Sequence, residues 1–312
     1  MKAYEILTPT TDLAHDEWLG YRCKGIGGSD AAAIVGLNPW SSPTAVYADK
    51  MGITQPKESN EAMRLGTDLE EYVAKRFTEE TGKKVRRRNA ILRSVEHPFM
   101  LANVDRMVVG EDAGLECKTT SPWNKSEWET GDVPQTYYCQ CCHYMAVTGY
   151  DRWYLAVLVL GKGFYWYQID RNEDDINALI EAESAFWENL KNGIPPEPDG
   201  SEASAAVIRS MYDGEDGGEV MLTGVAADLQ RYDEIQSMIR ALEMEEAGIV
   251  QRIQTQMGNA HVGHANGWKA TWTPVTSTRL DTKKIKAEKP ELYDMYAKTS
   301  TSRRFTLKKE AV

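Results

Sequence analysis

The stretch LECKT at residues 115–119, preceded by ANVD at residues 102–105, places two acidic side chains and a lysine next to apolar residues. In a strand, successive side chains point to opposite faces, so Glu116 and Lys118 project together while their neighbours can be buried. A glycine-bounded turn at 110–114 can bring Asp105 beside Glu116. Two carboxylates held together repel unless a cation lies between them, and carboxylate oxygens suit Mg²⁺. The pattern predicts a metal centre that activates water and stabilises charge on a phosphate, with Lys118 orienting the water or a phosphate oxygen.

This pattern is short, and a salt bridge of Lys118 with Glu116 or Asp105 explains it equally well. Two neighbours favour the metal centre. Glu70 lies on the inward face of a helix expected from residue 67, where it can be a second metal ligand, although 67–70 also fits a helix capping box. Gln140 shares a helical face with Tyr137 and can position substrate or water, although that face also reads as a packing stripe.

The composition is that of a soluble protein of ordinary size. The 312 residues are 42% hydrophobic and 27% charged. No apolar run is long enough to span a bilayer, and residues 1–18 do not resemble a secretory signal, so a cytoplasmic location is expected.

The formal net charge of -11 is unevenly distributed. A protein that acts on phosphates need not be basic, because metal ions held by its carboxylates invert the local charge. Residues 197–246 carry 13 acidic against 3 basic side chains, which we interpret as a solvated surface. Residues 279–312 carry 10 basic against 5 acidic side chains. A second basic patch precedes the proposed centre, and both basic regions fit phosphate contact or solvation: Lys83, Lys84, Arg86, Arg87, Arg88 and Arg93.

The five cysteines do not form a disulfide framework, because their number is odd and three are clustered. Cys139, Cys141 and Cys142 lie on one expected helix, where their side chains fan around the axis rather than converge. We expect buried free thiols, with an iron–sulfur cluster as the alternative.

The order of elements predicts an α/β (α+β) fold for residues 1–200, with a central mixed sheet flanked by helices. Helices are expected over 29–35, 67–81, 135–148 and 174–191. Strands are expected over 99–109, 115–119, 153–160 and 164–169, the last two forming a hairpin.

A proline-rich break at 194–200 ends this domain, and we expect a linker over 201–218. Residues 219–312 are expected to form an accessory module. An apolar stripe over 222–257 predicts a long helix or a helical hairpin. Asn266-Gly267 predicts a β-hairpin, followed by a helix over 283–298 and a last strand over 303–308.

Five motifs occur in an order that resembles the YqaJ-like viral recombinases, which are relatives of phage lambda exonuclease in the PD-(D/E)XK nuclease superfamily. The similarity covers roughly residues 15–195. The motifs are Arg22-x-x-x-Ile26-Gly27-Gly28-Ser29, Leu65-Gly66-x-x-x-Glu70, Asp105, Glu116-Cys117-Lys118 and Pro134-x-x-Tyr137-x-x-Gln140-x-x-x-Tyr144.

The resemblance implies a role for each matching residue. Asp105, Glu116 and the backbone carbonyl of Cys117 bind metal, with Glu70 supporting a second ion. Two ions are expected, Mg²⁺ or alternatively Mn²⁺. Lys118 assists the attacking water, and Gln140 lies beside the centre.

Arg22 and Ser29 match positions that hold a 5′-terminal phosphate, and an arginine can bind phosphate through two hydrogen bonds. A surface salt bridge is the alternative for Arg22. Tyr137 is included as a DNA contact. Asp30 is interpreted as a local helix cap.

The leading hypothesis is a metal-dependent exonuclease that resects duplex DNA ends from 5′ to 3′ and exposes 3′ single strands for annealing. The resemblance further implies a ring-like homo-oligomer, a single-strand annealing partner of the RecT or Bet kind, and a phage or prophage origin. An endonuclease of restriction or nicking type on the same core is one alternative. A DNA-end-binding scaffold with a vestigial centre is the other.

Overall fold

The computed structural model describes residues 2–54, 60–212, 214, 217–299 and 303–309. The chain divides into two compact units, Met1–Asp213 and Gly214–Val312, which are described separately. None of the described helices combines the length and apolarity needed to cross a membrane.

The centre of the first unit is a five-stranded sheet in the order β3-β6-β7-β8-β9. Its strands are β3 (Val85–Arg87), β6 (Arg106–Val108), β7 (Ala113–Thr120), β8 (Arg152–Val159) and β9 (Gly163–Asp170). Strands β7 and β8 are parallel and the other pairs antiparallel. The sheet is therefore mixed, which confirms the predicted fold class.

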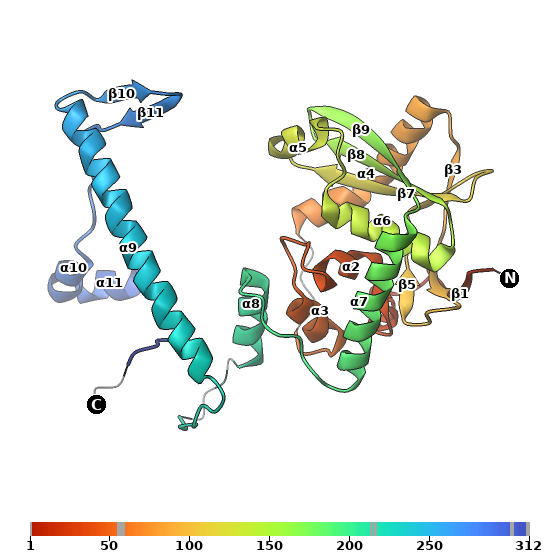
Figure 1. Ribbon diagram of the computed structural model, residues 1–312, viewed down its shortest axis with the longest axis horizontal. Coiled ribbons are helices and arrows are strands. Elements are labelled where there is room, and N and C mark those ends of the chain that lie inside the picture. The colour runs from red at the N-terminus through yellow and green to blue at the C-terminus, as the bar shows by residue number, and fades with distance from the viewer. Residues whose placement is uncertain (1, 55–59, 213, 215–216, 300–302, 310–312) are drawn as a thin grey trace. The chain divides into compact units, whose positions relative to one another are not determined.

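Helix α4 (Glu61–Thr81) covers one face of this sheet and helix α6 (Gln135–Thr148) the other (Figure 1). Alternation along β8 explains this arrangement, because Tyr154 packs with α4 whereas Trp153 and Leu155 pack with α6. The α6 layer continues into α7 (Glu173–Lys191), whose Ile176 is fully buried.

Helix α4 begins at an Asn60 cap, whose side chain accepts a hydrogen bond from the Met63 amide. It therefore starts well before residue 67. Thr67 lies inside the helix and donates to the Met63 carbonyl at 3.2 Å, so the capping-box interpretation of 67–70 is wrong. Gly82 ends the helix in the left-handed conformation with a φ of 74°, as glycine commonly does.

A second sheet, in the order β1-β4-β5-β2, was not predicted. It contains β1 (Tyr4–Pro9), β4 (Ala90–Ser94), β5 (Met100–Ala102) and the short β2 (Ile26–Gly27). The strand expected over 99–109 is wrong as one element, because β5 and β6 belong to different sheets. The segment between them, which includes Asp105, passes from one sheet to the other.

The other short helices of this unit are α1 (His15–Arg22), α2 (Gly28–Ile34), α3 (Pro43–Lys50), the 3₁₀ turn η1 (Pro122–Asn124) and α5 (Lys125–Glu129). Helix α2 contacts β2 of the second sheet, whereas α5 packs beside β9 of the first, where the Tyr167 hydroxyl donates to the Trp128 carbonyl.

The segment expected to be a linker, 201–218, contains helix α8 (Glu202–Met211). Ser201 caps this helix by accepting from the Ser204 amide, and the buried Ser204 hydroxyl lies 3.0 Å from that of Ser42. Burial of Val207 completes the docking of the helix against the first unit. Residues 213, 215 and 216 of the expected linker lie outside the described residues.

In the second unit the apolar stripe forms one continuous helix, α9 (Ala226–Met257). Of the two expected alternatives, the long helix is confirmed and the helical hairpin is wrong. Gly248 does not break it, since a glycine inside a helix costs only about 1 kcal/mol relative to alanine. The hairpin β10 (Val262–Ala265) and β11 (Trp268–Thr271) turns at Asn266-Gly267, as predicted.

Two short helices, α10 (Thr282–Glu288) and α11 (Pro290–Tyr296), replace the single helix expected over 283–298. Proline at the start of α11 separates them, because it cannot continue the hydrogen bonding of the preceding helix. The strand expected over 303–308 is wrong, because residues 303–309 are described and contain no strand. Residues 300–302 and 310–312 of the predicted module lie outside the described residues.

Candidate active site

Glu116 lies in the middle of β7 and is only 3% exposed. Its Oε1 accepts hydrogen bonds from Gln140 Nε2 and from Lys118 Nζ, each at 2.7 Å. Its Oε2 is buried and accepts no hydrogen bond from any described residue. A buried carboxylate oxygen without a donor is costly, so this atom indicates the place of a cation.

Asp105 reaches the same place from the segment that joins the two sheets. Its Oδ2 accepts a hydrogen bond from the Cys117 amide at 2.8 Å, which ties it to the strand that carries Glu116. Burial raises the pKa of Asp105 well above its ordinary value, and the Glu116 charge raises it further, whereas Lys118 opposes both effects. Two carboxylates are thus held together at a cost that a bound cation would remove.

Lys118 shares the face of Glu116, as strand alternation predicted. Burial alone would lower the pKa of this ammonium, but the carboxylates of Glu116 and Asp105 raise it above its ordinary value. Lys118 is therefore a hydrogen-bond donor at neutral pH and not a base. The salt bridge that was the alternative explanation is present, but it leaves Glu116 Oε2 without a partner.

The oxygen atoms of this site fit a hard divalent cation. Among the described residues, no three His, Cys, Asp or Glu side chains are arranged to hold one ion. Side chains can therefore supply Asp105 and Glu116, and main-chain carbonyls and water would have to complete the coordination.

Glu70, the expected ligand of a second ion, contacts an arginine that the sequence did not single out. The buried Arg106 guanidinium contacts Glu70 Oε1 through Nη1 and Glu71 Oε2 through Nη2, the latter at 3.0 Å. The Glu71 side chain is 68% exposed. Arg106 was missed although one signal was available, namely a charged residue between the apolar Val104 and Met107.

Gln140 is 7% exposed and connects the centre to α6. Its Nε2 donates to Glu116 and, at 2.9 Å, to the Tyr144 hydroxyl, which in turn donates to the Asn103 carbonyl at 3.1 Å. Tyr137 lies one turn earlier on the same helix, with Lys118 Nζ 5.4 Å from the centre of its ring. The amide of Gln140 therefore fixes the Glu116 carboxylate in place.

Arg22 and Ser29 contact each other, Arg22 Nη2 donating to Ser29 Oγ at 2.8 Å. Arg22 also lies 3.4 Å from Asp30 Oδ1, and its guanidinium is 4.9 Å from the centre of the Trp18 ring. Asp30 accepts from the Gly27 amide at 3.0 Å, which confirms the predicted local cap.

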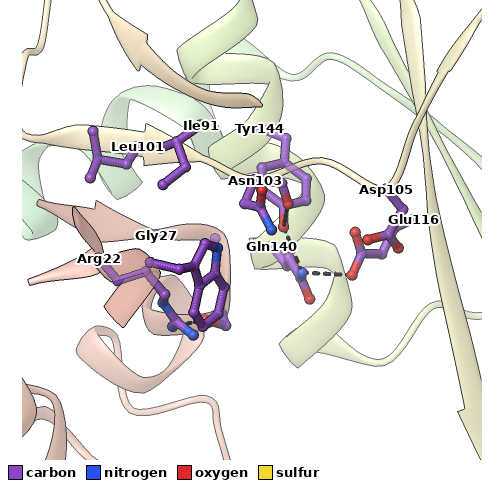
Figure 2. A pocket seen from close by; sticks show the side chains of 12 residues that line it. Arg22, Gly27, Ile91, Leu101, Asn103, Asp105, Glu116, Gln140 and Tyr144 are labelled. Carbon is purple, nitrogen blue, oxygen red and sulfur yellow. Dashed lines mark hydrogen bonds between the residues drawn. The ribbon is translucent and has the colours of Figure 1, made fainter. Parts of the chain in front are cut away.

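A cavity of about 150 Å³ joins these residues to the carboxylates. Figure 2 shows Arg22 on one side of it and Gln140, Glu116 and Asp105 on the other. Gly28 lies in its wall, where a Cβ would come within 2.6 Å of the Tyr144 ring, so this close approach of α2 to α6 requires glycine. The structure thus brings together residues from four of the five sequence motifs around one cavity.

The remaining candidates lie elsewhere. Cys139, Cys141 and Cys142 are buried free thiols, as predicted, and burial raises the pKa of each. In the basic patch before the centre, three of the six cations form ion pairs with carboxylates: Lys83 with Glu111, Arg87 with Glu71 and Arg93 with Glu5. Those three are therefore partly neutralised within the fold.

The sequence matches the YqaJ-like viral recombinase domain over residues 17–151. It is also 41% identical to YqaJ, an uncharacterized protein of Bacillus subtilis (strain 168), over 98% of both chains. The chain belongs to the YqaJ family. Because nearly the whole chain aligns, the sequence of the second unit has a counterpart in this relative.

The fold of this chain is similar to that of an alkaline exonuclease from Laribacter hongkongensis, with 23% identity and a TM-score of 0.50. The match covers 57% of this chain and 94% of the other. The same exonuclease in complex with dAMP gives 24% identity and a TM-score of 0.51 over the same fractions. This similarity shows that the two chains share a fold, in agreement with the fold class that the sequence predicted.

Proposed function

We propose that this protein is a divalent-metal-dependent deoxyribonuclease that degrades duplex DNA from its ends. The observation that carries the proposal is the buried Glu116 Oε2, which lacks a hydrogen-bond donor among the described residues. Glu116 lines the same cavity as Asp105. Membership of a viral recombinase family and a fold shared with an exonuclease support it.

Asp105, Glu116 and the backbone carbonyl of Cys117 would hold the ion, Mg²⁺ or alternatively Mn²⁺. When bound, the ion lowers the pKa of a coordinated water and offsets charge that develops on the phosphate. Glu70 is proposed to support the centre, and the two ions expected from the resemblance remain a prediction.

The residues of the chain divide the remaining work. Lys118, kept protonated by its two carboxylate neighbours, donates a hydrogen bond to the water or to a phosphate oxygen. Gln140 keeps Glu116 Oε1 occupied, so that Oε2 stays directed to the ion. Tyr137 is retained as a DNA contact beside Lys118.

Arg22 and Ser29 are proposed to bind a 5′-terminal phosphate, because they line the same cavity as the carboxylates. Together with the lambda-type resemblance, this favours 5′→3′ degradation that leaves 3′ single strands for annealing. From the same resemblance we propose a ring-like homo-oligomer and a single-strand annealing partner of the RecT or Bet kind. We also propose that the protein acts in the cytoplasm of a bacterial host.

Linear duplex and covalently closed circular DNA of the same sequence, incubated with the protein and Mg²⁺, test this proposal. Degradation of the linear DNA alone is the expected result. Equal degradation of both would favour the endonuclease alternative. Binding of ends without any cleavage would favour the scaffold with a vestigial centre.

A further inference from the structure

Arg106 is the first residue of β6 and is only 3% exposed. Its Nη1 contacts Glu70 Oε1 and donates to the Asp105 carbonyl at 2.7 Å, and its Nη2 donates to Glu71 Oε2 at 3.0 Å. A buried guanidinium is stable only where its hydrogen bonds are satisfied by well-placed acceptors. Here the acceptors are two α4 side chains and the backbone of Asp105.

The alternation of side chains along β6 explains how Arg106 contacts both α4 and the backbone of Asp105. Met107 packs in the cluster on the α6 side of the sheet, whereas Val108 packs with α4. Arg106 is two residues before Val108, so it projects to the α4 side. It therefore connects α4 to the segment whose Asp105 carboxylate lies in the cavity with Glu116.

Arg106 also solves an electrostatic problem. Glu70 contacts the same Arg106 Nη1 that donates to the Asp105 carbonyl, and the Asp105 carboxylate lines a cavity with Glu116. Three carboxylates near one point repel one another, and Arg106 is the cation that pairs with the one coming from α4. Its rigid fork of donors can bind two carboxylates and a carbonyl at once, which the single ammonium of a lysine does less well.

We propose that Arg106 is a positioning residue of the metal centre, which fixes Glu70 and the Asp105 backbone in the arrangement that binds a divalent ion. This inference rests on the proposed function. Arg106 need not touch the substrate or the ion. Loss of a residue that orients metal ligands costs about 10- to 100-fold in metal affinity.

Arg87 provides a matched control. It binds the same Glu71 Oε2 at 2.8 Å, but its side chain is 57% exposed. Arg87→Gln therefore removes an arginine–carboxylate pair on the same helix without removing the contact to Glu70 or Asp105.

The experiment is a calorimetric titration of metal-free full-length protein with Mn²⁺ alone, with folding checked by circular dichroism. Relative to wild type, we expect Arg106→Gln to weaken the Mn²⁺ Kd by about 10- to 100-fold, Arg106→Lys to give an intermediate Kd, and Arg87→Gln to leave it unchanged. The intermediate value for lysine distinguishes positioning from general loss of packing. If Arg106→Gln does not fold, Arg106→Lys carries the same test.

A folded Arg106→Gln variant, or failing that Arg106→Lys, that binds Mn²⁺ within about twofold of the wild type would overturn the inference while leaving the proposed function intact. An equal loss in Arg87→Gln would also overturn it. A wild-type protein that binds no Mn²⁺ would contradict the proposed function itself, and the inference with it.

Discussion

Replacement of Glu116 by glutamine separates the catalytic role of this residue from any structural role. The substitution keeps the size of the side chain and the Oε1 acceptor for Gln140 and Lys118. It removes the negative charge and replaces the buried, unpaired Oε2 by an amide. We expect Glu116→Gln to lose activity without losing stability.

The contacts of Glu116 set the size of each effect. A hydrogen bond to a charged group contributes about 1.5–3 kcal/mol against about 1 kcal/mol for a neutral one, so weakening the Lys118 contact costs about 1–2 kcal/mol. Burying a neutral amide costs less than burying an unpaired carboxylate charge, and Asp105 loses a like-charged neighbour, so these two effects offset the weakened Lys118 contact. The free energy of unfolding should therefore change by less than about 1 kcal/mol. Metal chemistry contributes several kcal/mol to transition-state stabilisation, which corresponds to a loss of about 10²- to 10⁴-fold in rate.

Urea unfolding in the presence of EDTA and hydrolysis of linear duplex with Mg²⁺ measure the two effects separately. Glu80→Gln is the control, because Glu80 is an exposed carboxylate on α4 that pairs with Arg76 at 3.0 Å. A Glu116→Gln variant that keeps more than about a tenth of the hydrolysis rate would contradict a catalytic role of Glu116. A loss of more than about 3 kcal/mol in the free energy of unfolding would instead indicate a structural role.

Three further predictions concern other parts of the first unit. Arg22→Gln removes a proposed charge-assisted phosphate contact worth about 1.5–3 kcal/mol. The rate of hydrolysis of 5′-phosphorylated ends should therefore fall by about 10- to 100-fold relative to the rate on 5′-hydroxyl ends. An unchanged ratio of these two rates would count against a phosphate site at Arg22. His143 is fully buried, with Nδ1 2.8 Å from Glu183 Oε1 and Nε2 2.9 Å from the Leu101 carbonyl. Because this pair connects α6 to α7 inside the first unit, His143→Ala should lower the free energy of urea unfolding by about 3–5 kcal/mol. A loss below about 1 kcal/mol would contradict a stabilising role of the pair. Hydrogen bonds from two serines lower the pKa of Asp199 to about 2, and a depressed carboxyl pKa stabilises the fold above the unfolded value of about 4 but loses this effect as pH falls toward 2. The melting temperature of the wild type should therefore exceed that of Asp199→Asn at pH 6, and the difference should become smaller below pH 4. A difference in melting temperature that does not change with pH would exclude this linkage.

The parts of the fold that depend on local periodicity could be predicted from the sequence. The helix closed by Gly149 and the hairpin at residues 161–163 occur as expected. The four-stranded sheet could not be predicted, because its strands are short and pair across long separations, as Tyr4 does with Ser94. The separation of β5 from β6 could not be predicted for the same reason. It depends on β5 pairing with β4 in the second sheet, whereas β6 pairs with β3 and β7 in the first.

The candidate site shows a similar division. Alternation along one strand was enough to predict that Glu116 and Lys118 share a face, and their 2.7 Å contact confirms it. The partner of Glu70 could not be predicted, because Arg106 is 36 residues away and meets it only when α4 lies on the sheet. The roles of these residues remain predictions that experiment must test.

Digestion of a 5′-phosphorylated duplex, labelled at either the 5′ or the 3′ end, tests whether Asp105 and Glu116 form a metal-dependent catalytic centre. The comparison is between wild type and Asp105→Asn in the presence of Mg²⁺, with EDTA as the control. We expect wild type to release the 5′ label first as a short product, and Asp105→Asn and the EDTA control to release neither label. Equal digestion by Asp105→Asn, or digestion by wild type in EDTA, would contradict a metal centre at Asp105 and Glu116.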